Sequence, residues 1–216
     1  MHSRSDSSSP KWPEELEPLV QATQGLQPWR RAFHAASGLA MALVPWVLGW
    51  PQARTIMVLS VLLVIAVALD LVRLNVPSVN RSFFRVLRPL ASAREAAGIA
   101  SSTWYLVGGI LSYLLFTPQH AMLSILVLAI ADPAAALVGQ RFGGRRIGTG
   151  SVSGTLTFFA GATAILLLGV GRLEVALVGL AVALLETVPG IGDDNVVIPI
   201  STGILLTALA ATIGVG

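Results

Sequence analysis

An aspartate stands within a long apolar stretch of this sequence. Asp132 lies in residues 125–139, which read ILVLAIADPAAALVG. Placing a charged group at the centre of a membrane-spanning helix costs about 2.5–3.5 kcal/mol, and Asp132 has no basic neighbour in the sequence. Pro133 follows directly, and a proline inside such a helix frees backbone carbonyls, which is tolerated where the site faces a cavity or packed protein. We therefore predict a chemical role for Asp132.

A loop rich in glycine and arginine is expected next. Residues 139–155 read GQRFGGRRIGTGSVSGT, with six glycines and three arginines. Glycine amides can converge on an anion, arginine binds phosphate oxygens, and the helix that follows adds positive potential at its N-terminus. Ser151 or Ser153 could cap that helix. The segment is not a P-loop, because it contains no lysine; the alternative interpretation is a flexible basic connector.

A third polar cluster precedes the last apolar stretch. Asp193, Asp194 and Asn195 offer the hard oxygen ligands that suit Mg²⁺. The alternative is an ordinary turn that caps the last helix. Phosphoryl transfer requires positioning, a divalent metal and cationic stabilisation. Together with Asp132 and the Gly/Arg segment, this turn supplies candidates for all three.

Three further polar residues lie at the ends of apolar stretches. Asp70 precedes Arg73 by three residues, so both share one helix face. Glu95 follows Arg94 directly. Local pairing with these arginines is the alternative to a role in the polar site.

The composition indicates which elements position these residues. The chain has 216 residues, of which 54% are hydrophobic and 12% charged, about half the charged share of a soluble protein. Apolar runs of roughly 16–20 residues are long enough to cross a bilayer. The absence of cysteine excludes disulfides, thiol nucleophiles and Cys-ligated zinc. We predict an all-α, polytopic integral membrane protein with about seven transmembrane helices, at about 33–50, 55–73, 98–116, 120–139, 152–170, 173–188 and 195–214.

The arginines predict the orientation of these spans. Arg54 and Arg172 lie on one side, and ten arginines lie on the other: Arg30, Arg31, Arg73, Arg81, Arg85, Arg88, Arg94, Arg141, Arg145 and Arg146. The positive-inside rule then places the N-terminus in the cytoplasm. Residues 1–28 read as a polar cytoplasmic tail, partly disordered, before a transmembrane domain at 29–216. Within that domain, residues 78–95 suit an arginine-rich interfacial helix. Because the arginines flank apolar runs, we expect no nucleic-acid partner.

Several short motifs occur in a characteristic order. They are RRAFHAASG from Arg30, DLVR from Asp70 with Asn80 after it, Glu95 before STWYLVGG, AIADPAAALVGQRFG, SVSGT, and Glu186 before DDNVVIP. In order, spacing and common membrane face, this set resembles the membrane lipid kinases that include dolichol kinase, phytol kinase and CTP-dependent diacylglycerol kinase.

The resemblance implies transfer of the terminal phosphate of a nucleotide, often CTP, to a lipid alcohol with Mg²⁺. It assigns roles to four groups of residues. They are Asp132, Asp194, Asn195 and Glu186 for the metal; Gly139, Arg141, Gly143, Arg145, Arg146, Ser151, Ser153, Gly154 and Thr155 for nucleotide and phosphate; Arg31, His34 and Asn80 for the lipid headgroup; and Asp132, Asp70, Arg73 and Glu95 for catalysis. The sequence departs from the family pattern at Ala131, where glycine is usual, and in lacking a lysine before Ser151.

Two other functions use similar residues. A CTP-dependent cytidylyltransferase, which makes a CDP-lipid from a lipid phosphate, would need the same metal, basic loop and membrane face. A transporter or a non-catalytic scaffold is the more distant alternative, because transporters place ionisable groups near the midplane between repeats. Convergence of Asp132, Asp194 and the 139–155 segment at one margin would favour an enzyme.

Overall fold

The computed structural model describes residues 16–23 and 27–213. It is 79% helical, which confirms the all-α prediction. Most of the predicted N-terminal tail, residues 1–15 and 24–26, lies outside the described residues. In chain order the helices are α1 (Glu17–Gln21), α2 (Pro28–Val47), α3 (Gln52–Asn75), α4 (Pro77–Val86), the 3₁₀ turn η2 (Ala93–Ala96), α5 (Ser101–Leu115), α6 (Pro118–Leu126), the π-helical turn η3 (Val127–Ala131), α7 (Asp132–Phe142), α8 (Val152–Val170), α9 (Val175–Glu186) and α10 (Asp194–Ile213).

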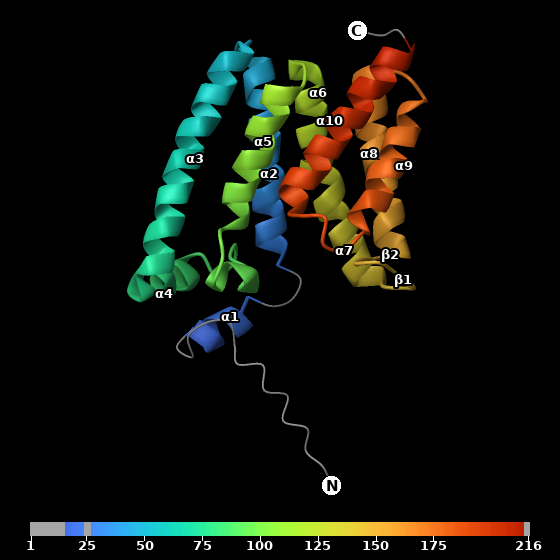
Figure 1. Ribbon diagram of the computed structural model, residues 1–216. Coiled ribbons are helices and arrows are strands. Elements are labelled where there is room, and N and C mark those ends of the chain that lie inside the picture. Colours follow the sequence, from blue (N-terminus) through green and yellow to red (C-terminus); the bar gives the residue numbers. More distant parts are fainter. Residues whose placement is uncertain (1–15, 24–26, 214–216) are drawn as a thin grey trace.

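Four helical stretches are long and apolar enough to cross a membrane: Gln52–Asn75, Pro118–Phe142, Val152–Val170 and Asp194–Thr212. A shorter apolar helix, Val175–Glu186, accompanies them. The chain is therefore a multi-pass membrane protein, and the count of about seven spans stays a prediction. Figure 1 shows the long helices side by side, with α1, α4 and the β1–β2 hairpin at one end and the end of α10 at the other.

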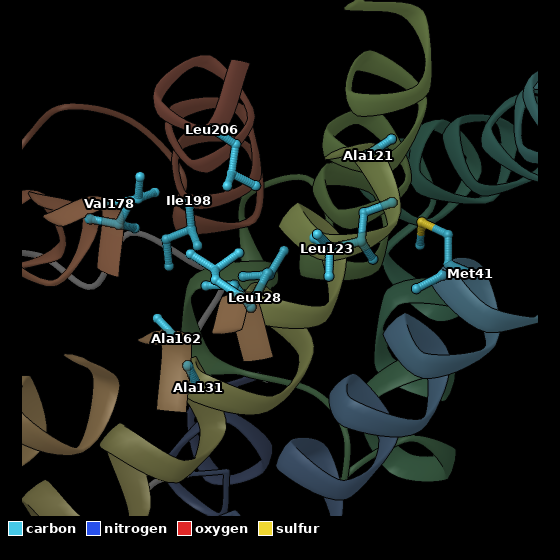
Figure 2. Packing of buried hydrophobic residues seen from close by; sticks show 14 of the residues in the cluster. Met41, Ala121, Leu123, Leu128, Ala131, Ala162, Val178, Ile198 and Leu206 are labelled. Atoms are coloured by element: carbon cyan, nitrogen blue, oxygen red, sulfur yellow. The ribbon is translucent and has the colours of Figure 1, made fainter. Parts of the chain in front are cut away.

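The core lies where the long helix 118–142 meets its neighbours. α8 packs on α7, η3 and α9, while α10 packs on α5, α6 and α9. Figure 2 shows Leu128, Ile198 and Leu206 meeting in this core, with the small residues Ala131 and Ala162 beside them. Small residues let helix backbones approach closely within a membrane, so packing explains many of the glycines and alanines of the spans.

The helix that carries Asp132 changes its winding just before that residue. α6, η3 and α7 form one continuous helix, with the π-helical turn η3 ending at Ala131. Pro133 has no backbone N–H to donate. π turns occur mostly as single-turn bulges inside α-helices, and frequently at functional sites. The irregularity therefore lies directly beside the candidate residue.

Two of the predicted segments are shorter in the structure. The expected interfacial helix 78–95 is shorter: α4 ends at Val86, and η2 forms a separate turn. Pro89 explains the break, because proline disfavours a helical conformation in the residue before it.

The expected loop 139–155 is also shorter, because α7 runs to Phe142 and α8 starts at Val152. Between these helices, β1 (Arg146–Ile147) pairs antiparallel with β2 (Gly150–Ser151). Gly148, at φ +53°, occupies the hairpin tip.

Candidate functional site

A polar cavity of about 710 Å³ opens at the end of the bundle that carries α1 and α4. It lies among the start of α2, the η2 region, the start of α7 and the turn before α10. We call it the polar cavity. Its charged and hydrogen-bonding lining comprises Thr23, Gln27, Arg30, Arg31, His34, Ser92, Arg94, Glu95, Ser101, Trp104, Asp132, Asp193, Asp194 and Asn195.

Asp132 is the acid that the helix winding presents to this cavity. Its side chain is 29% exposed, and its Oδ2 lies 4.0 Å from Nε2 of His34. Asp132 also interacts electrostatically with Asp194 and Glu186, which repel its charge, and with Arg31, which attracts it. Asp132 thus lies near acids that repel its charge, an arrangement that a cation would stabilise.

The three polar residues at the start of α10, Asp193 to Asn195, have different environments. Asp193 caps the helix, since its Oδ1 accepts hydrogen bonds from the backbone N (3.0 Å) and the Nδ2 (2.7 Å) of Asn195. The predicted cap of the last helix is therefore present, and Asp193 alone supplies it. Asp194 remains exposed toward solvent at the cavity wall, while Asn195 is buried.

A second cavity, of about 410 Å³, adjoins the polar cavity, and Ala136 lines both. We call it the loop cavity, because the hairpin and the start of α8 form its wall. Its lining includes Gly139, Gly143, Gly144, Arg146, Gly150, Ser151, Gly154, Thr155 and Glu186. Asp132 and Asp194 thus line one cavity, and the Gly/Arg segment lines the next.

Local hydrogen bonds explain the shape of the loop cavity. Oγ of Ser151 accepts from the backbone N of Gly154 at 3.2 Å, which confirms that Ser151 caps α8. Oγ of Ser153 donates to the carbonyl of Gly143 at 2.7 Å. Thr155 is 9% exposed, and within the described chain its Oγ1 has no hydrogen-bond partner. An unsatisfied hydroxyl at a helix N-terminus is suited to an anionic ligand.

Close approach between chain segments positions this loop. A Cβ on Gly148 would come within 1.8 Å of the carbonyl oxygen of Thr187, so only glycine fits there. The backbone N of Thr149 donates to the same carbonyl at 3.0 Å. The hairpin is therefore held against the end of α9, where Glu186 lies.

A third cavity, of about 480 Å³, is lined mainly by apolar side chains of α2, α3, α4 and α5. We call it the apolar groove. Four residues line both this groove and the polar cavity: Arg30, His34, Glu95 and Ser101. Nη2 of Arg30 donates to Oγ of Ser101 at 2.7 Å, and this hydroxyl donates to Glu95 at 2.8 Å. These contacts tie α2 to the start of α5 where the two cavities meet.

A buried polar network lies beside the start of α5, away from these three cavities. It contains Asp70, Arg73 and Asn80. Nε of Arg73 donates to Oδ1 of Asp70 at 2.7 Å, and Nη1 donates to Oδ1 of Asn80 at 3.3 Å. Arg73 also donates to the backbone carbonyls of Glu95 and Gly98, each at 2.6 Å. Asp70 and Arg73 thus form the local pair that their i,i+3 spacing predicted. Through Arg73, the pair also holds the segment that carries Glu95.

The structure also adds residues that the sequence did not single out. Arg30, Arg94 and Ser101 line the polar cavity, although the sequence motifs gave none of them a role there. Arg30 belongs to the arginine pair that opens the RRAFHAASG motif, and that pair is the sequence signal that could have identified it. By contrast, Arg141 and Arg145 are exposed and line none of the three cavities.

The acids of the polar cavity fit one mode of Mg²⁺ binding. Within the residues described, no three His, Asp or Glu side chains lie close enough to hold a metal ion by themselves. Mg²⁺ is usually bound through one or two carboxylates together with substrate phosphates and water. Asp132 and Asp194 on one cavity wall, with the oxygen of Asn195 beside them, suit that mode.

Comparison with known proteins finds CTP-dependent diacylglycerol kinases and an uncharacterized protein among the relatives. The chain is 29% identical over 114 residues to CTP-dependent diacylglycerol kinase 1 of Saccharomyces cerevisiae, covering 53% of this chain and 39% of the relative. The Schizosaccharomyces pombe protein of the same name is 29% identical over 114 residues, with 53% and 52% covered. An uncharacterized protein of Rickettsia prowazekii is 27% identical over 136 residues, with 62% and 65% covered.

The chain therefore matches about half or less of the length of these kinases. No family model and no solved structure matches it. The two kinases agree with the resemblance to CTP-dependent diacylglycerol kinases that the sequence motifs carry.

Proposed function

We propose that this protein transfers the terminal phosphate of CTP to the hydroxyl of a lipid alcohol, at the cytoplasmic face of the membrane. The observation that carries the proposal is the polar cavity, where Asp132 and Asp194 face Arg30, Arg31 and Arg94. Acids that can hold a metal and arginines that can bind phosphate are the groups phosphoryl transfer uses. The similarity to CTP-dependent diacylglycerol kinases supports CTP as donor and diacylglycerol as the first acceptor to test.

The nucleotide would extend through both the loop cavity and the polar cavity. The start of α8 and the hydroxyl of Thr155 would bind phosphate oxygens in the loop cavity, with Arg146 beside them. The terminal phosphate would then lie in the polar cavity near Arg30 and Arg31, which can neutralise its charge.

Asp132 and Asp194, with Asn195, would hold Mg²⁺ bound to the phosphates, and Glu186 is a further acidic candidate. Mg²⁺ would neutralise charge that develops on the phosphates. We assign Asp70, Arg73 and Asn80 to positioning, because their polar atoms are occupied by one another and by the backbone near Glu95. The arginine distribution supports a cytoplasmic orientation for this end of the bundle.

A direct assay tests the proposal. Purified protein in detergent would receive Mg²⁺ and terminally labelled CTP, with diacylglycerol, phytol or a polyprenol in separate reactions, and labelled ATP in parallel. Label in the lipid fraction is expected with CTP. If label never reaches lipid and pyrophosphate appears only with a lipid phosphate, the protein is a cytidylyltransferase. If neither product forms and the nucleotide does not bind, the proposal is wrong.

A further inference from the structure

The apolar groove has the position of a substrate site on the membrane side of the polar cavity. α3 packs mainly on α5 and α4, whereas α2 packs on α6, η3 and α7. The groove lies between these two sets of helices, and in Figure 1 α3 stands at the edge of the bundle. Leu62, Ile65 and Leu69 of α3 line it and remain 46%, 51% and 64% exposed. Such a groove, open beside a membrane-exposed helix, suits a hydrocarbon chain.

Two of the side chains that line the groove carry unsatisfied polar atoms, and the hydroxyl of one of them, Tyr105, packs against Gly38 of α2. Tyr105 is 3% exposed, lines the groove, and within the described part of the chain its hydroxyl has no hydrogen-bond partner. Its ring stacks on that of His34, with centroids 4.2 Å apart. The Nε2 atom of His34 is also buried and meets no partner at hydrogen-bond distance among the described residues, although the imidazole interacts with the backbone of Leu128. A buried polar atom without a partner costs stability unless a ligand satisfies it.

His34 connects the groove to the polar cavity. It lines both, and its Nε2 points to the side of Asp132, 4.0 Å from Oδ2. A ligand with an apolar tail and a hydroxyl end would therefore place the tail among the leucines of α3. Its hydroxyl would reach the rim where His34 and Ser101 lie.

We propose that the apolar groove binds the hydrocarbon chain of a lipid alcohol, which enters from the bilayer between α2 and α3 and presents its hydroxyl to Nε2 of His34. This inference rests on the proposed kinase function for the identity of the ligand. It assigns the acceptor to the α2–α3–α5 side of the polar cavity and the nucleotide to the α7–α8 side.

Photo-crosslinking tests the site without relying on activity. The probe is a long-chain alcohol with a diazirine midway along its chain, added to the purified protein, and the labelled residues are mapped by mass spectrometry. We expect label on Leu62, Ile65 and Leu106, removed by excess diacylglycerol. If label spreads over the whole exposed surface of α3 and excess diacylglycerol does not remove it, the proposal that the groove binds lipid is wrong.

A matched pair of variants tests the same site. Ala66 is half-buried and lines the groove, whereas Ala68 is exposed two residues further along α3 and lines none of the described cavities. Ala66→Trp should fill the groove and lower probe labelling about tenfold, the effect of losing roughly two methylene contacts. It should raise KM for the lipid and leave KM for CTP unchanged. Ala68→Trp should change neither, and equal effects of both variants would contradict the proposal.

A substitution at the rim tests the placement of the hydroxyl. His34→Phe keeps an aromatic ring against Tyr105 but removes Nε2. We expect probe labelling to persist while kcat falls at least about tenfold. An unchanged kcat would refute the placement. If the wild-type protein labels in the groove but phosphorylates no lipid, the kinase proposal fails and the groove stands. If it phosphorylates lipid but takes up label elsewhere, the groove fails and the kinase proposal stands.

Discussion

Replacing Arg73 with alanine should destabilise the fold, because this side chain joins three separate segments. Arg73 is 3% exposed and donates to Asp70, to Asn80 and to the carbonyls of Glu95 and Gly98. Oδ2 of Asp70 accepts in turn from the backbone N of Ala100 (3.0 Å) and from Oγ1 of Thr103 (2.7 Å). The pair therefore links α3 to the start of α5.

The expected cost follows from what alanine leaves behind. Asp70 is 5% exposed, so its carboxylate would remain buried without its cation. Breaking a buried pair by removing one partner costs about 3–5 kcal/mol, and the carbonyls of Glu95 and Gly98 would also lose their donor. For a chain of this size, such a loss corresponds to a fall in melting temperature on the order of 10 °C.

Thermal unfolding in detergent measures this effect. Arg85→Ala removes the same charge from an exposed position of α4 and should leave the melting temperature nearly unchanged. Asp70→Asn combined with Arg73→Ala should be less destabilising than Arg73→Ala alone, because no buried anion remains. If Arg73→Ala melts like the wild type but loses activity, then Arg73 acts in the reaction and the positioning role is wrong.

Two further predictions concern the nucleotide side of the site. Asp194→Asn should raise the Mg²⁺ concentration for half-maximal rate at least about 10-fold, since even the loss of an outer-shell partner costs that much. A metal titration of label transfer measures this, and an unchanged titration would remove Asp194 from the metal site. Gly139→Ala should weaken CTP binding in an equilibrium binding assay, because its Cβ would come within 2.8 Å of Oγ of Ser151 and disturb the cap of α8. The control is Gly49→Ala, which strains the backbone at φ +59° but lines none of the three cavities, and it should leave CTP binding unchanged. Wild-type CTP binding by Gly139→Ala would contradict the loop assignment.

Much of the fold could be predicted because apolar runs of sufficient length have few alternatives in a membrane. Residues 55–73 were expected as a span, and α3 extends this range to Gln52–Asn75. The ends of elements were less accurate. The segment 139–155 was expected as a loop rich in glycine and arginine, yet its first four residues continue α7. A helix on which tertiary packing acts can retain glycine despite its low propensity.

The polar residues were harder to place from the sequence. Asp132 could be singled out because nothing nearby in the sequence offsets its charge. For Asp70 and Arg73, the i,i+3 spacing shows that they share a helix face, but not whether that face meets a cavity or another chain segment. Their partners Asn80 and Glu95 come from later turns, so only the tertiary fold reveals the network. The apolar groove likewise depends on how α2 and α3 separate, which no motif encodes.

The most direct test of the proposed function is label transfer from terminally labelled CTP to diacylglycerol by wild type and Asp132→Asn, with Glu174→Gln as the matched control. Glu174 is an exposed acid that pairs with Arg172 at 2.9 Å before α9. We expect Asp132→Asn to lose at least about a hundredfold in rate while keeping its melting temperature, and Glu174→Gln to retain the wild-type rate. A wild-type rate in Asp132→Asn would contradict the central claim.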